Sequence, residues 1–272
     1  MSVVVCRAAR AARAADPTAT KRSSRVAPVL DSLIAAQKCV QGARRLAVLS
    51  GAGMSAESGV PTFRDAQTGL WSRFDPMQLA SEDGFRADPS LVWGWYASRR
   101  DAVARALPNR GHLALAEAER SGRRIAVITQ NVDGLHRRAG STEVIELHGS
   151  ITRTICLSKC GYSEDEPARL PPGEPPRCPQ CGNWLRPGVV WFGEMLDAEH
   201  LAAAEAAATE CDVLLVVGTS GMVYPAAGLP LAARRAGATV VIINPAPSEI
   251  DDCAHWVLRG TAAAILPRLL AA

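Results

Sequence analysis

The chain has 272 residues, of which 48% are hydrophobic and 21% are charged, so it has the composition of a globular protein and not of a disordered one. Its 30 Lys and Arg against 27 Asp and Glu leave a net charge of +3, too small an excess to favour nucleic-acid binding. No stretch approaches the roughly 20 apolar residues that cross a bilayer, so we expect no membrane span.

The first 28 residues form a basic segment that we exclude from the fold. Its only acidic residue is Asp16, and its basic residues are Arg7, Arg10, Arg13, Lys21, Arg22 and Arg25. Arg-rich, acid-poor N-termini include organelle transit peptides, although a disordered tail has the same composition. We expect a disordered basic tail over residues 1–28 and one folded domain over residues 29–272.

From residue 29 onward, helical patterns alternate with short apolar, β-branched runs. A helical period covers residues 29–40, and the runs follow at 46–49, 125–128, 144–147, 213–217, 240–243 and 255–258. Helical stretches at 111–121, 198–209 and 225–236 separate several of these runs. The alternation predicts an α/β fold: a Rossmann-like, doubly wound parallel sheet covered on both faces.

Two stretches interrupt this alternation, and we expect them to build a smaller second lobe. Residues 61–110 hold loop sequence and a Trp-rich helical segment, and residues 151–188 are rich in Pro, Gly and Cys. The large lobe then comprises residues 29–60, 111–150 and 189–272. Because ligands of such sheets bind beyond the carboxyl ends of the strands, the second lobe would close a cleft over that site.

Four of the eight cysteines have the spacing of zinc ligands. Cys156 and Cys160 form one pair, Cys178 and Cys181 form another, and a glycine follows each pair. Two such knuckles predict one closed, structural Zn²⁺ site, with two disulfides or four free thiols as the alternatives. Cys6 and Cys39 show no pairing pattern, and Cys211 and Cys253 lie beside predicted strands as small apolar residues.

A glycine-rich turn follows the first predicted strand. Gly51 and Gly53 would let backbone amides approach a pyrophosphate, and residues 55–59 are expected to open a helix whose N-terminus adds positive potential. The third glycine comes too late for a standard dinucleotide fingerprint.

Several blocks of the sequence resemble the signatures of the sirtuins, the NAD-dependent protein lysine deacylases. They occur in the family's order across residues 30–272: 51–64 (GAGMSAESGVPTFR), 130–136 (QNVDGLH), 146–149 (ELHG), the four cysteines, 186–194 (RPGVVWFGE), 218–220 (GTS) and 243–245 (INP). The resemblance implies a Rossmann-like lobe, a zinc lobe, and a cleft that binds NAD and an acyl-lysine peptide.

The resemblance also implies a mechanism and a catalytic residue. The acyl oxygen attacks C1′ of the nicotinamide ribose and expels nicotinamide; O-acyl-ADP-ribose and free lysine follow, so NAD is consumed as a co-substrate. His148, just beyond a predicted strand, corresponds to the base that activates a ribose hydroxyl. His136 is expected to be structural, and we assign no role to His112, His200 or His255.

The resemblance assigns further residues to the cofactor and to the peptide. Phe63 would shield C1′, and Asp133 would order the ribose site. The NAD-binding set is Gly51, Ala52, Gly53, Ala56, Phe63, Arg64, Gln130, Asn131, Asp133, Gly218, Thr219, Ser220, Asn244 and Ala262. Residues 189–194, a core strand by pattern alone, would pair with the substrate backbone through Val190, Trp191, Phe192 and Gly193.

One helical segment bears on the acyl group. Tyr96 and Arg99 are three residues apart and share a face, which is equally the pattern of an ordinary amphipathic helix. The pair is similar to the Tyr-x-x-Arg of the desuccinylase-like class III sirtuins, where it binds the distal carboxylate of succinyl- or malonyl-lysine. Gly84 matches a small residue of that branch. We expect desuccinylation and demalonylation to exceed deacetylation, which is retained.

Other functions stay open at this stage. A plain deacetylase and a mono-ADP-ribosyltransferase would use the same scaffold, whereas a zinc ribbon for nucleic acid is disfavoured by the acidic residues in 151–188. We expect acyl-lysine proteins or peptides as partners, no specific nucleic acid, no membrane and a monomer. We expect a cytoplasmic location, or a mitochondrial one if the tail is a transit peptide.

Overall fold

The large lobe is built on one parallel sheet. The computed structural model describes residues 4–5, 29–60, 75–165 and 173–271. Six strands lie side by side in the order β11-β10-β8-β2-β3-β4, all parallel: β2 (Arg45–Ser50), β3 (Arg124–Thr129), β4 (Val144–Glu146), β8 (Val213–Val217), β10 (Thr239–Ile243) and β11 (Trp256–Leu258). The predicted parallel α/β sheet is therefore confirmed, with each apolar run in its place.

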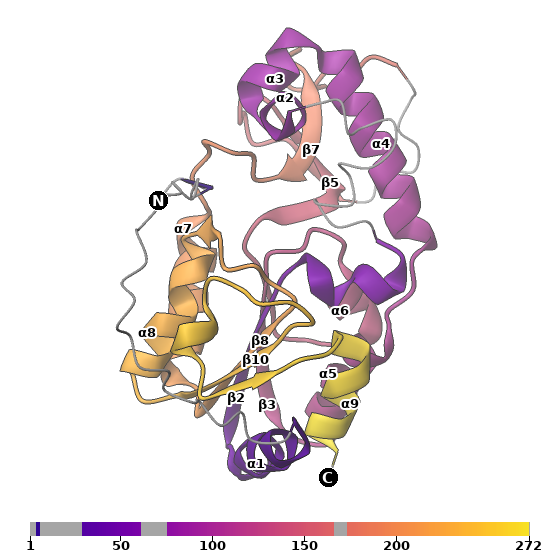
Figure 1. Cartoon of the computed structure of the whole chain (residues 1–272). Coiled ribbons are helices and arrows are strands. Elements are labelled where there is room, and N and C mark those ends of the chain that lie inside the picture. Colours follow the sequence, from indigo (N-terminus) through magenta and orange to yellow (C-terminus); the bar gives the residue numbers. More distant parts are fainter. Residues whose placement is uncertain (1–3, 6–28, 61–74, 166–172, 272) are drawn as a thin grey trace, which may run out of the picture.

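Helices cover both faces of this sheet because its strands are apolar on both sides. In β2, Leu46 and Val48 enter one core, whereas Ala47 and Leu49 enter the other, as the pleat requires. The first core receives α1 (Val29–Gly42), α5 (Arg110–Arg120) and α9 (Ala262–Leu270), and the second receives α7 (Ala198–Glu210) and α8 (Leu229–Arg235). Figure 1 shows α7 and α8 on one side of the sheet and α5 and α9 on the other.

The strand order reverses next to β2, and this reversal positions the site. The chain proceeds from β2 through β3 to β4, then crosses to the other side of β2 and continues through β8, β10 and β11. The carboxyl ends of β2 and β8 therefore diverge at a topological switch point, the usual ligand position in doubly wound sheets.

The two insertions share a single core, separate from those of the sheet. One contributes α2 (Pro76–Leu79), α3 (Glu82–Ala87) and α4 (Pro89–Arg105); the other contributes an antiparallel sheet of β5 (Gly149–Cys156), β6 (Ser163–Asp165) and β7 (Leu185–Val189). Phe85 and Trp95 pack with Ile151 and Trp191 in this third core. Arg100 extends from α4 to the carbonyl oxygens of Ile151 and Arg153, which ties the insertions together.

Two local expectations are wrong. Residues 55–59 do not open a helix: η1 (Ala52–Met54) and η2 (Ala56–Ser58) are single 3₁₀ turns, and Gly59 ends the second one in the left-handed conformation at φ 78°. Residues 189–194 do not form one strand, because β7 ends at Val189 and Glu194 N–H donates back to the carbonyl oxygen of Trp191, which makes a turn.

The remaining elements are short. They are β1 (Val4–Val5), α6 (Leu135–Ala139), β9 (Val223–Tyr224), η5 (Ala226–Gly228) and η6 (Asp251–Cys253). β1 pairs antiparallel with β9, so part of the segment expected as a tail forms a strand. The rest of that segment lies outside the described residues. No helix in the described part of the chain is long and apolar enough to cross a membrane.

Candidate active site at the carboxyl edge of the sheet

The loops that follow β2 and β8 cross in direct backbone contact. Gly51 N–H donates to the Val217 carbonyl and Gly53 N–H to the Gly218 carbonyl, both at 2.9 Å. A Cβ on Gly51 would lie 2.9 Å from Gly218 O, and one on Gly53 would lie 2.8 Å from Gly218 Cα. These glycines are thus required by the crossing of two loops. This differs from the expectation that their amides approach a phosphate, because both N–H groups already donate within the protein.

The amides left for an anion are those of two alanines in the same loop. Met54 N–H donates to Gly51 O and Ser55 N–H to Ala52 O, so both are also used. Ala52 and Ala56 are exposed, and among the described residues no acceptor is recorded for either N–H group. A phosphate at this edge would therefore meet these two N–H groups. The 3₁₀ turns are too short to add the potential of a helix dipole.

A buried polar cluster joins the end of β3 to the loop after β2. Asn131 Nδ2 donates to Gly51 O at 3.0 Å and to Ser55 Oγ at 3.1 Å. Ser55 Oγ in turn donates to Asp133 Oδ2 at 2.7 Å. Burial raises the pKa of Asp133, while hydrogen bonds from Leu135 N–H and Ser55 and the charges of Arg138 and Arg99 act in the opposite direction.

Thr219 connects three strand ends. Gln130 Nε2, after β3, donates to Thr219 Oγ1 at 3.1 Å, and Asn244 Nδ2, after β10, donates to Thr219 O at 3.0 Å. The next residue, Ser220, accepts from Glu249 N–H. Four sequence-predicted groups thus meet at one edge although more than 110 residues separate the first from the last.

His148 lies just beyond β4, with its two ring nitrogens in different environments. Nδ1 lies 3.0 Å from the carbonyl oxygen of Gln130, which can only accept, so Nδ1 carries the hydrogen. Nε2 is buried and has no hydrogen-bond partner within the described part of the chain. Burial lowers the pKa of His148, which keeps the ring neutral and leaves a lone pair on Nε2. This arrangement is suited to accepting a proton.

Two other histidines form a structural pair. The rings of His112 and His136 are 4.8 Å apart at an edge-to-face angle of 62°. His136 Nε2 lies 2.9 Å from Ser50 Oγ, and His112 Nδ1 accepts from Asn109 N–H. Burial lowers the pKa of His112 to about 4 and that of His136 to about 3, so both are neutral core residues.

In the small lobe, α4 presents Tyr96 and Arg99 toward the region of Asp133. Tyr96 is buried, and its hydroxyl oxygen accepts a hydrogen bond from Trp191 Nε1 at 3.0 Å. The Arg99 guanidinium lies 4.9 Å from the centre of the Trp95 ring. Burial lowers the pKa of Arg99, and Tyr96 and Asp133 act electrostatically in the opposite direction.

A glycine is required at position 84 for a steric reason that is independent of the space an acyl chain needs. A Cβ at Gly84 would lie 2.3 Å from the carbonyl oxygen of Gln78, in the tight connection between α2 and α3. A side chain is thus excluded by the neighbouring backbone, whatever the substrate.

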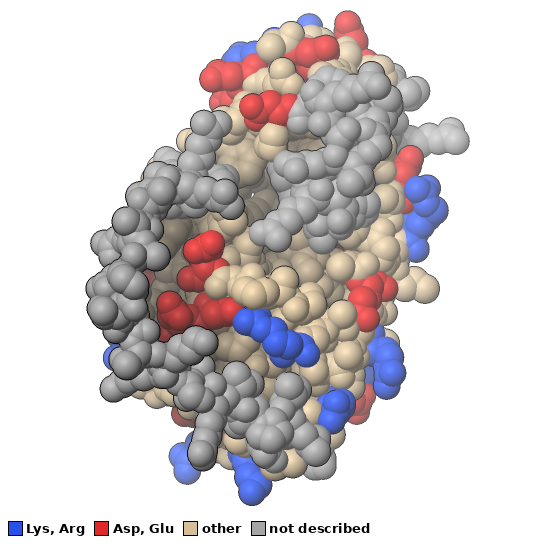
Figure 2. All heavy atoms as spheres, in the orientation of Figure 1, with Lys and Arg blue, Asp and Glu red and all other residues tan. Residues whose placement is uncertain are grey.

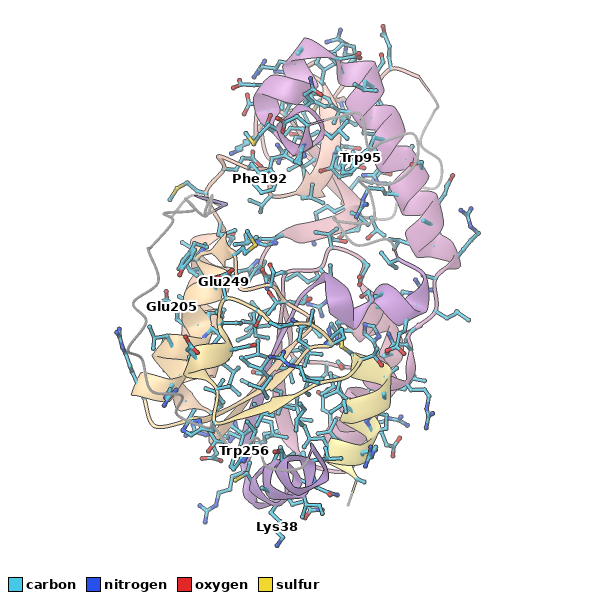
Figure 3. All side chains as sticks on the ribbon, viewed as in Figure 1. Lys38, Trp95, Phe192, Glu205, Glu249 and Trp256 are labelled. Atoms are coloured by element: carbon cyan, nitrogen blue, oxygen red, sulfur yellow. The ribbon has the colours of Figure 1, made fainter. Side chains whose placement is uncertain are left out.

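The segment after β7 uses most of its amides internally. Val190 N–H donates to His148 O, Trp191 N–H to Glu194 Oε2 and Phe192 N–H to Ala80 O, at 2.8–2.9 Å. Gly193 is the one residue of 190–193 whose N–H has no recorded acceptor among the described residues. Figure 3 shows Phe192 at the edge of the small lobe that faces the large lobe, with Trp95 on α4.

A buried ion pair in this segment was missed by the sequence reasoning. Arg186 Nη1 and Nη2 donate to the two oxygens of Glu194 at 2.9 and 2.8 Å, and Nη2 also donates to Val189 O. Arg186 is 3% exposed, and its guanidinium lies 3.8 Å from the centre of the Trp191 ring. The available signal was a pair of opposite charges at the two ends of an otherwise apolar run.

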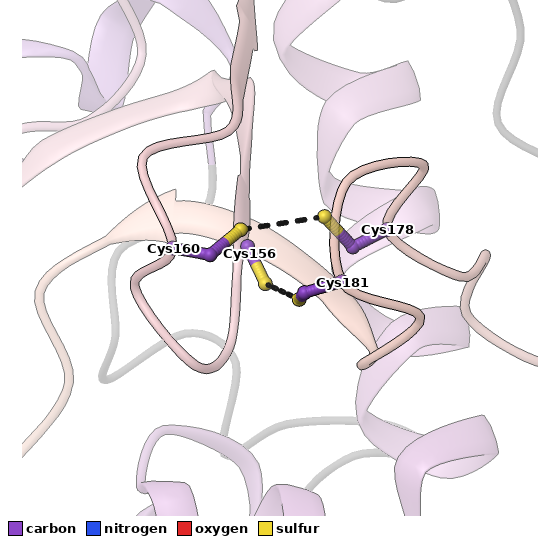
Figure 4. Close-up of side chains that lie close together, drawn as sticks. All are labelled: Cys156, Cys160, Cys178 and Cys181. Carbon is purple, nitrogen blue, oxygen red and sulfur yellow. Dashed lines mark hydrogen bonds between the residues drawn. The ribbon is translucent and has the colours of Figure 1, made fainter.

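The four cysteines of the predicted metal site converge from two loops (Figure 4). Their Sγ atoms all lie within 4.8 Å of one another, with Cys156 and Cys181 3.4 Å apart and Cys160 and Cys178 3.6 Å apart. A tetrahedron of thiolates about 2.3 Å from zinc has edges of about 3.8 Å, whereas a disulfide needs about 2.05 Å. The cluster suits Zn²⁺, and none of the four cysteines forms a disulfide, so the disulfide alternative is wrong.

The remaining predicted positions are peripheral to this geometry or outside it. Ala262 begins α9 and is buried; a Cβ on Gly111 would lie 3.0 Å from its carbonyl oxygen. Phe63 and Arg64 lie outside the described residues. Figure 2 shows a hollow between the lobes, and the described residues on this face form no concentrated patch of Lys and Arg.

Comparison with known proteins gives a consistent result. The model of the Sir2 family matches residues 51–225. An "NAD-dependent protein deacylase" of Ralstonia nicotianae is 54% identical over 236 residues, which cover 87% of this chain and 95% of the relative. A solved complex of a Sir2 homologue with ADP-ribose is 45% identical, with a TM-score of 0.80 over 86% of this chain and 93% of the other.

A second solved structure includes a peptide product. It is a Sir2 variant with a deacetylated p53 peptide and 3′-O-acetyl ADP-ribose; it is 32% identical to this chain, with a TM-score of 0.79 over 88% of this chain and 97% of the other.

Proposed function

The chain belongs to the Sir2 family and is an NAD-dependent protein deacylase, and we propose that it prefers lysines whose acyl group ends in a carboxylate. Its substrates are acylated peptides or proteins. Succinyl- and malonyl-lysine are the proposed preferred substrates, and acetyl-lysine a weaker one.

The proposed NAD site uses the groups assembled at the switch point. The N–H groups of Ala52 and Ala56, which have no recorded acceptor among the described residues, suit the pyrophosphate, and Gln130, Asn131 and Asp133 suit the nicotinamide ribose. The adenosine half would lie against Gly218, Thr219, Ser220, Asn244 and Ala262. When bound, NAD supplies the ADP-ribosyl group that accepts the acyl group. The support is the convergence of these side chains on the crossing of Gly51, Gly53 and Gly218.

We propose His148 as the general base. Its Nε2 would take the proton of a ribose hydroxyl, because Nδ1 is held as the donor to Gln130 O and Nε2 is the nitrogen with a free lone pair. The Gln130 carbonyl thus fixes both the ring's orientation and its tautomer.

The preference for a carboxylate is carried by one observation on Arg99. Its guanidinium is half-buried against Trp95, and within the described part of the chain it makes no hydrogen bond or ion pair with a carboxylate. Even a half-buried cation without such a partner is unfavourable, and an acyl carboxylate would satisfy it with charge-assisted hydrogen bonds. An acetyl group has no carboxylate at its far end, so it would not provide the Arg99 guanidinium with a partner.

The test is a peptide panel with and without Arg99. We expect Arg99→Met to lower kcat/KM for succinyl- and malonyl-peptides by roughly 10- to 100-fold, the cost of a lost charged hydrogen bond, while the acetyl-peptide changes little. Arg105→Met, exposed in the last turn of the same helix, is the matched control. Equal losses on all peptides, or none, would refute the preference.

Mass spectrometry of the nucleotide product separates O-acyl-ADP-ribose from transfer of ADP-ribose to protein.

Two further properties are proposals of the same kind. We propose a monomer in a reducing compartment such as the cytoplasm. Seven described cysteines are free thiols, and the large exposed apolar side chains are dispersed over several elements, for example Ile34 on α1 and Leu231 on α8. Light scattering would check the monomer.

A further inference from the structure

Trp191 has a polar contact that its proposed role does not use. Its proposed role in peptide binding concerns the main chain, yet its indole is fully buried in the small lobe. The ring centre lies 5.3 Å from that of Phe85, and the Arg186 guanidinium covers one face at 3.8 Å. Trp191 Nε1 lies 3.0 Å from the Tyr96 hydroxyl oxygen. The indole therefore contacts the very side chain that is proposed to meet the acyl group.

The direction of this hydrogen bond follows from the chemistry of the two groups. An indole N–H can only donate, so the Tyr96 oxygen must accept. The Tyr96 hydrogen then cannot point back at Trp191 and is directed elsewhere. Burial raises the pKa of Tyr96 to about 12, so the hydroxyl keeps its hydrogen at neutral pH. Accepting one hydrogen bond also strengthens the hydroxyl as a donor.

We propose that Trp191 is a specificity-determining positioning residue, which compels the Tyr96 hydroxyl to donate its hydrogen to the distal carboxylate of an acyl-lysine. This inference deepens the proposed function and depends on it. Arg99 supplies the charge for the carboxylate, and Tyr96, oriented by Trp191, supplies a directed neutral donor. Acetyl-lysine presents no acceptor to Tyr96, so its turnover does not depend on this orientation.

The Arg186–Glu194 pair holds Trp191 in place through two contacts, one on its backbone and one on its ring. Glu194 Oε2 accepts from the Trp191 backbone N–H at 2.8 Å and from Arg186 Nη2 at 2.8 Å. The guanidinium that makes this pair is the one that covers the Trp191 ring. Because a buried ion pair adds little net stability compared with apolar packing, its value here is the single geometry that it imposes on residues 186–194.

The test removes the indole N–H and keeps an aromatic ring. Trp191→Phe should raise KM for a succinyl-peptide by about 3- to 10-fold, as expected for a lost neutral hydrogen bond, with kcat nearly unchanged. The acetyl-peptide should lose less, so the ratio of succinyl to acetyl kcat/KM should fall, because any effect on peptide binding through the main chain is common to both substrates. In a Tyr96→Phe background, which has no hydroxyl to orient, Trp191→Phe should add no further succinyl-specific loss. Trp256→Phe on β11 makes the same change at the far end of the large lobe (Figure 3) and should affect neither substrate.

The outcomes separate this inference from the proposed function. If Tyr96→Phe and Arg99→Met discriminate between the peptides but Trp191→Phe does not, the inference is wrong and the carboxylate preference stands. If none of the three discriminates, the preference itself fails. Should Trp191→Phe unfold at the assay temperature, Glu194→Gln, which keeps the side-chain shape, must show the same succinyl-specific rise in KM. Equal losses on both peptides with Glu194→Gln would also overturn the inference.

Discussion

One backbone hydrogen bond and burial keep His148, the proposed base, in its neutral form. The Gln130 carbonyl fixes the hydrogen on Nδ1, and burial disfavours the charged ring, so the pKa of His148 lies below its ordinary value. A base with a lowered pKa stays deprotonated to lower pH. We therefore expect the apparent pKa on the acid limb of the kcat/KM profile to lie below the usual imidazole value of about 6.5.

A pH profile of kcat/KM with a saturating concentration of NAD checks this expectation. His200→Gln, an exposed position on α7, should leave the profile unchanged. His148→Ala should lower kcat by about 10²- to 10⁴-fold, the usual contribution of a general base. If the apparent pKa on the acid limb of the wild-type profile lies at or above the ordinary imidazole value, this account of His148 is wrong.

The buried His112–His136 pair makes stability depend on pH. Both pKa values are lowered in the folded protein, to about 4 and about 3, so below about pH 6.5 the unfolded chain binds more protons than the folded one. The free energy of unfolding should therefore fall as pH falls from about 6.5 toward those values. At pH 5 the loss is about 2 kcal/mol per imidazole.

Urea unfolding at pH 7 and pH 5 measures this loss. His112→Gln replaces one titrating ring by a neutral side chain and should reduce the difference between the two pH values by about half. If His112→Gln leaves the difference unchanged, the pair is not its source.

At the scale of elements, the sheet could be predicted because its signal is local. Each strand is a short apolar run between turn residues, and parallel strands are apolar on both faces, so runs such as 213–217 are visible without knowledge of their neighbours. The helix expected at 55–59 failed because Gly59 adopts a left-handed conformation and Pro61 follows, which ends the turn.

The site could be predicted only as far as the family motifs reach. The crossing that requires Gly51 and Gly53 depends on Gly218, more than 160 residues away, so the motif alone suggested the wrong reason for the glycines. The bond between Tyr96 and Trp191 likewise spans 95 positions. Local patterns carry no information on which distant side chain will satisfy a hydroxyl, because packing decides that.

The loop crossing should be intolerant of a single methyl group. A Cβ on Gly218 would lie 2.4 Å from Met54 N, and Gly218 has φ +61°. We expect Gly218→Ala to destabilise the protein by about 1–3 kcal/mol through overpacking and backbone strain, and to weaken NAD binding because the β2 loop must move.

The matched control is Gly94→Ala in the middle of α4, where a Cβ has no neighbour within 4 Å. That change should stabilise the protein by about 0.5–1 kcal/mol, because alanine is the better helix former. Thermal unfolding and NAD titration of both variants give the comparison. A neutral Gly218→Ala would show that the crossing is not tightly packed.

Across the whole molecule, the proposed NAD-binding groups and the proposed acyl-binding groups lie on different hydrophobic cores. The proposed NAD groups stand on the sheet, whose two faces have their own cores, whereas Tyr96, Trp191 and Arg186 belong to the small lobe. The zinc loops are joined to the proposed acyl side by β7, which begins at Leu185 just after them and carries Arg186, the partner of Glu194. The metal therefore supports the geometry of Glu194 and Trp191 more directly than that of the NAD site.

Removal of zinc should therefore abolish deacylation while ADP-ribose binding is retained. Near the four cysteines the described core is small, with Cys156, Cys178 and Leu185 buried and Tyr162 against them, so the metal must supply much of its folding free energy. We expect a strong chelator to abolish deacylation and to change the fluorescence of Trp184, over which Arg177 is stacked.

Binding of ADP-ribose should survive the same treatment within about tenfold, since the sheet and its loops keep their own cores. Calorimetry with ADP-ribose before and after chelation, followed by re-addition of Zn²⁺ to restore activity, makes the measurement. Cys160→Ser should reproduce the chelated state, whereas Cys211→Ala, a buried thiol two residues before β8 and outside the four-cysteine cluster, should not. Loss of ADP-ribose binding together with activity would mean that the two lobes fold as one unit.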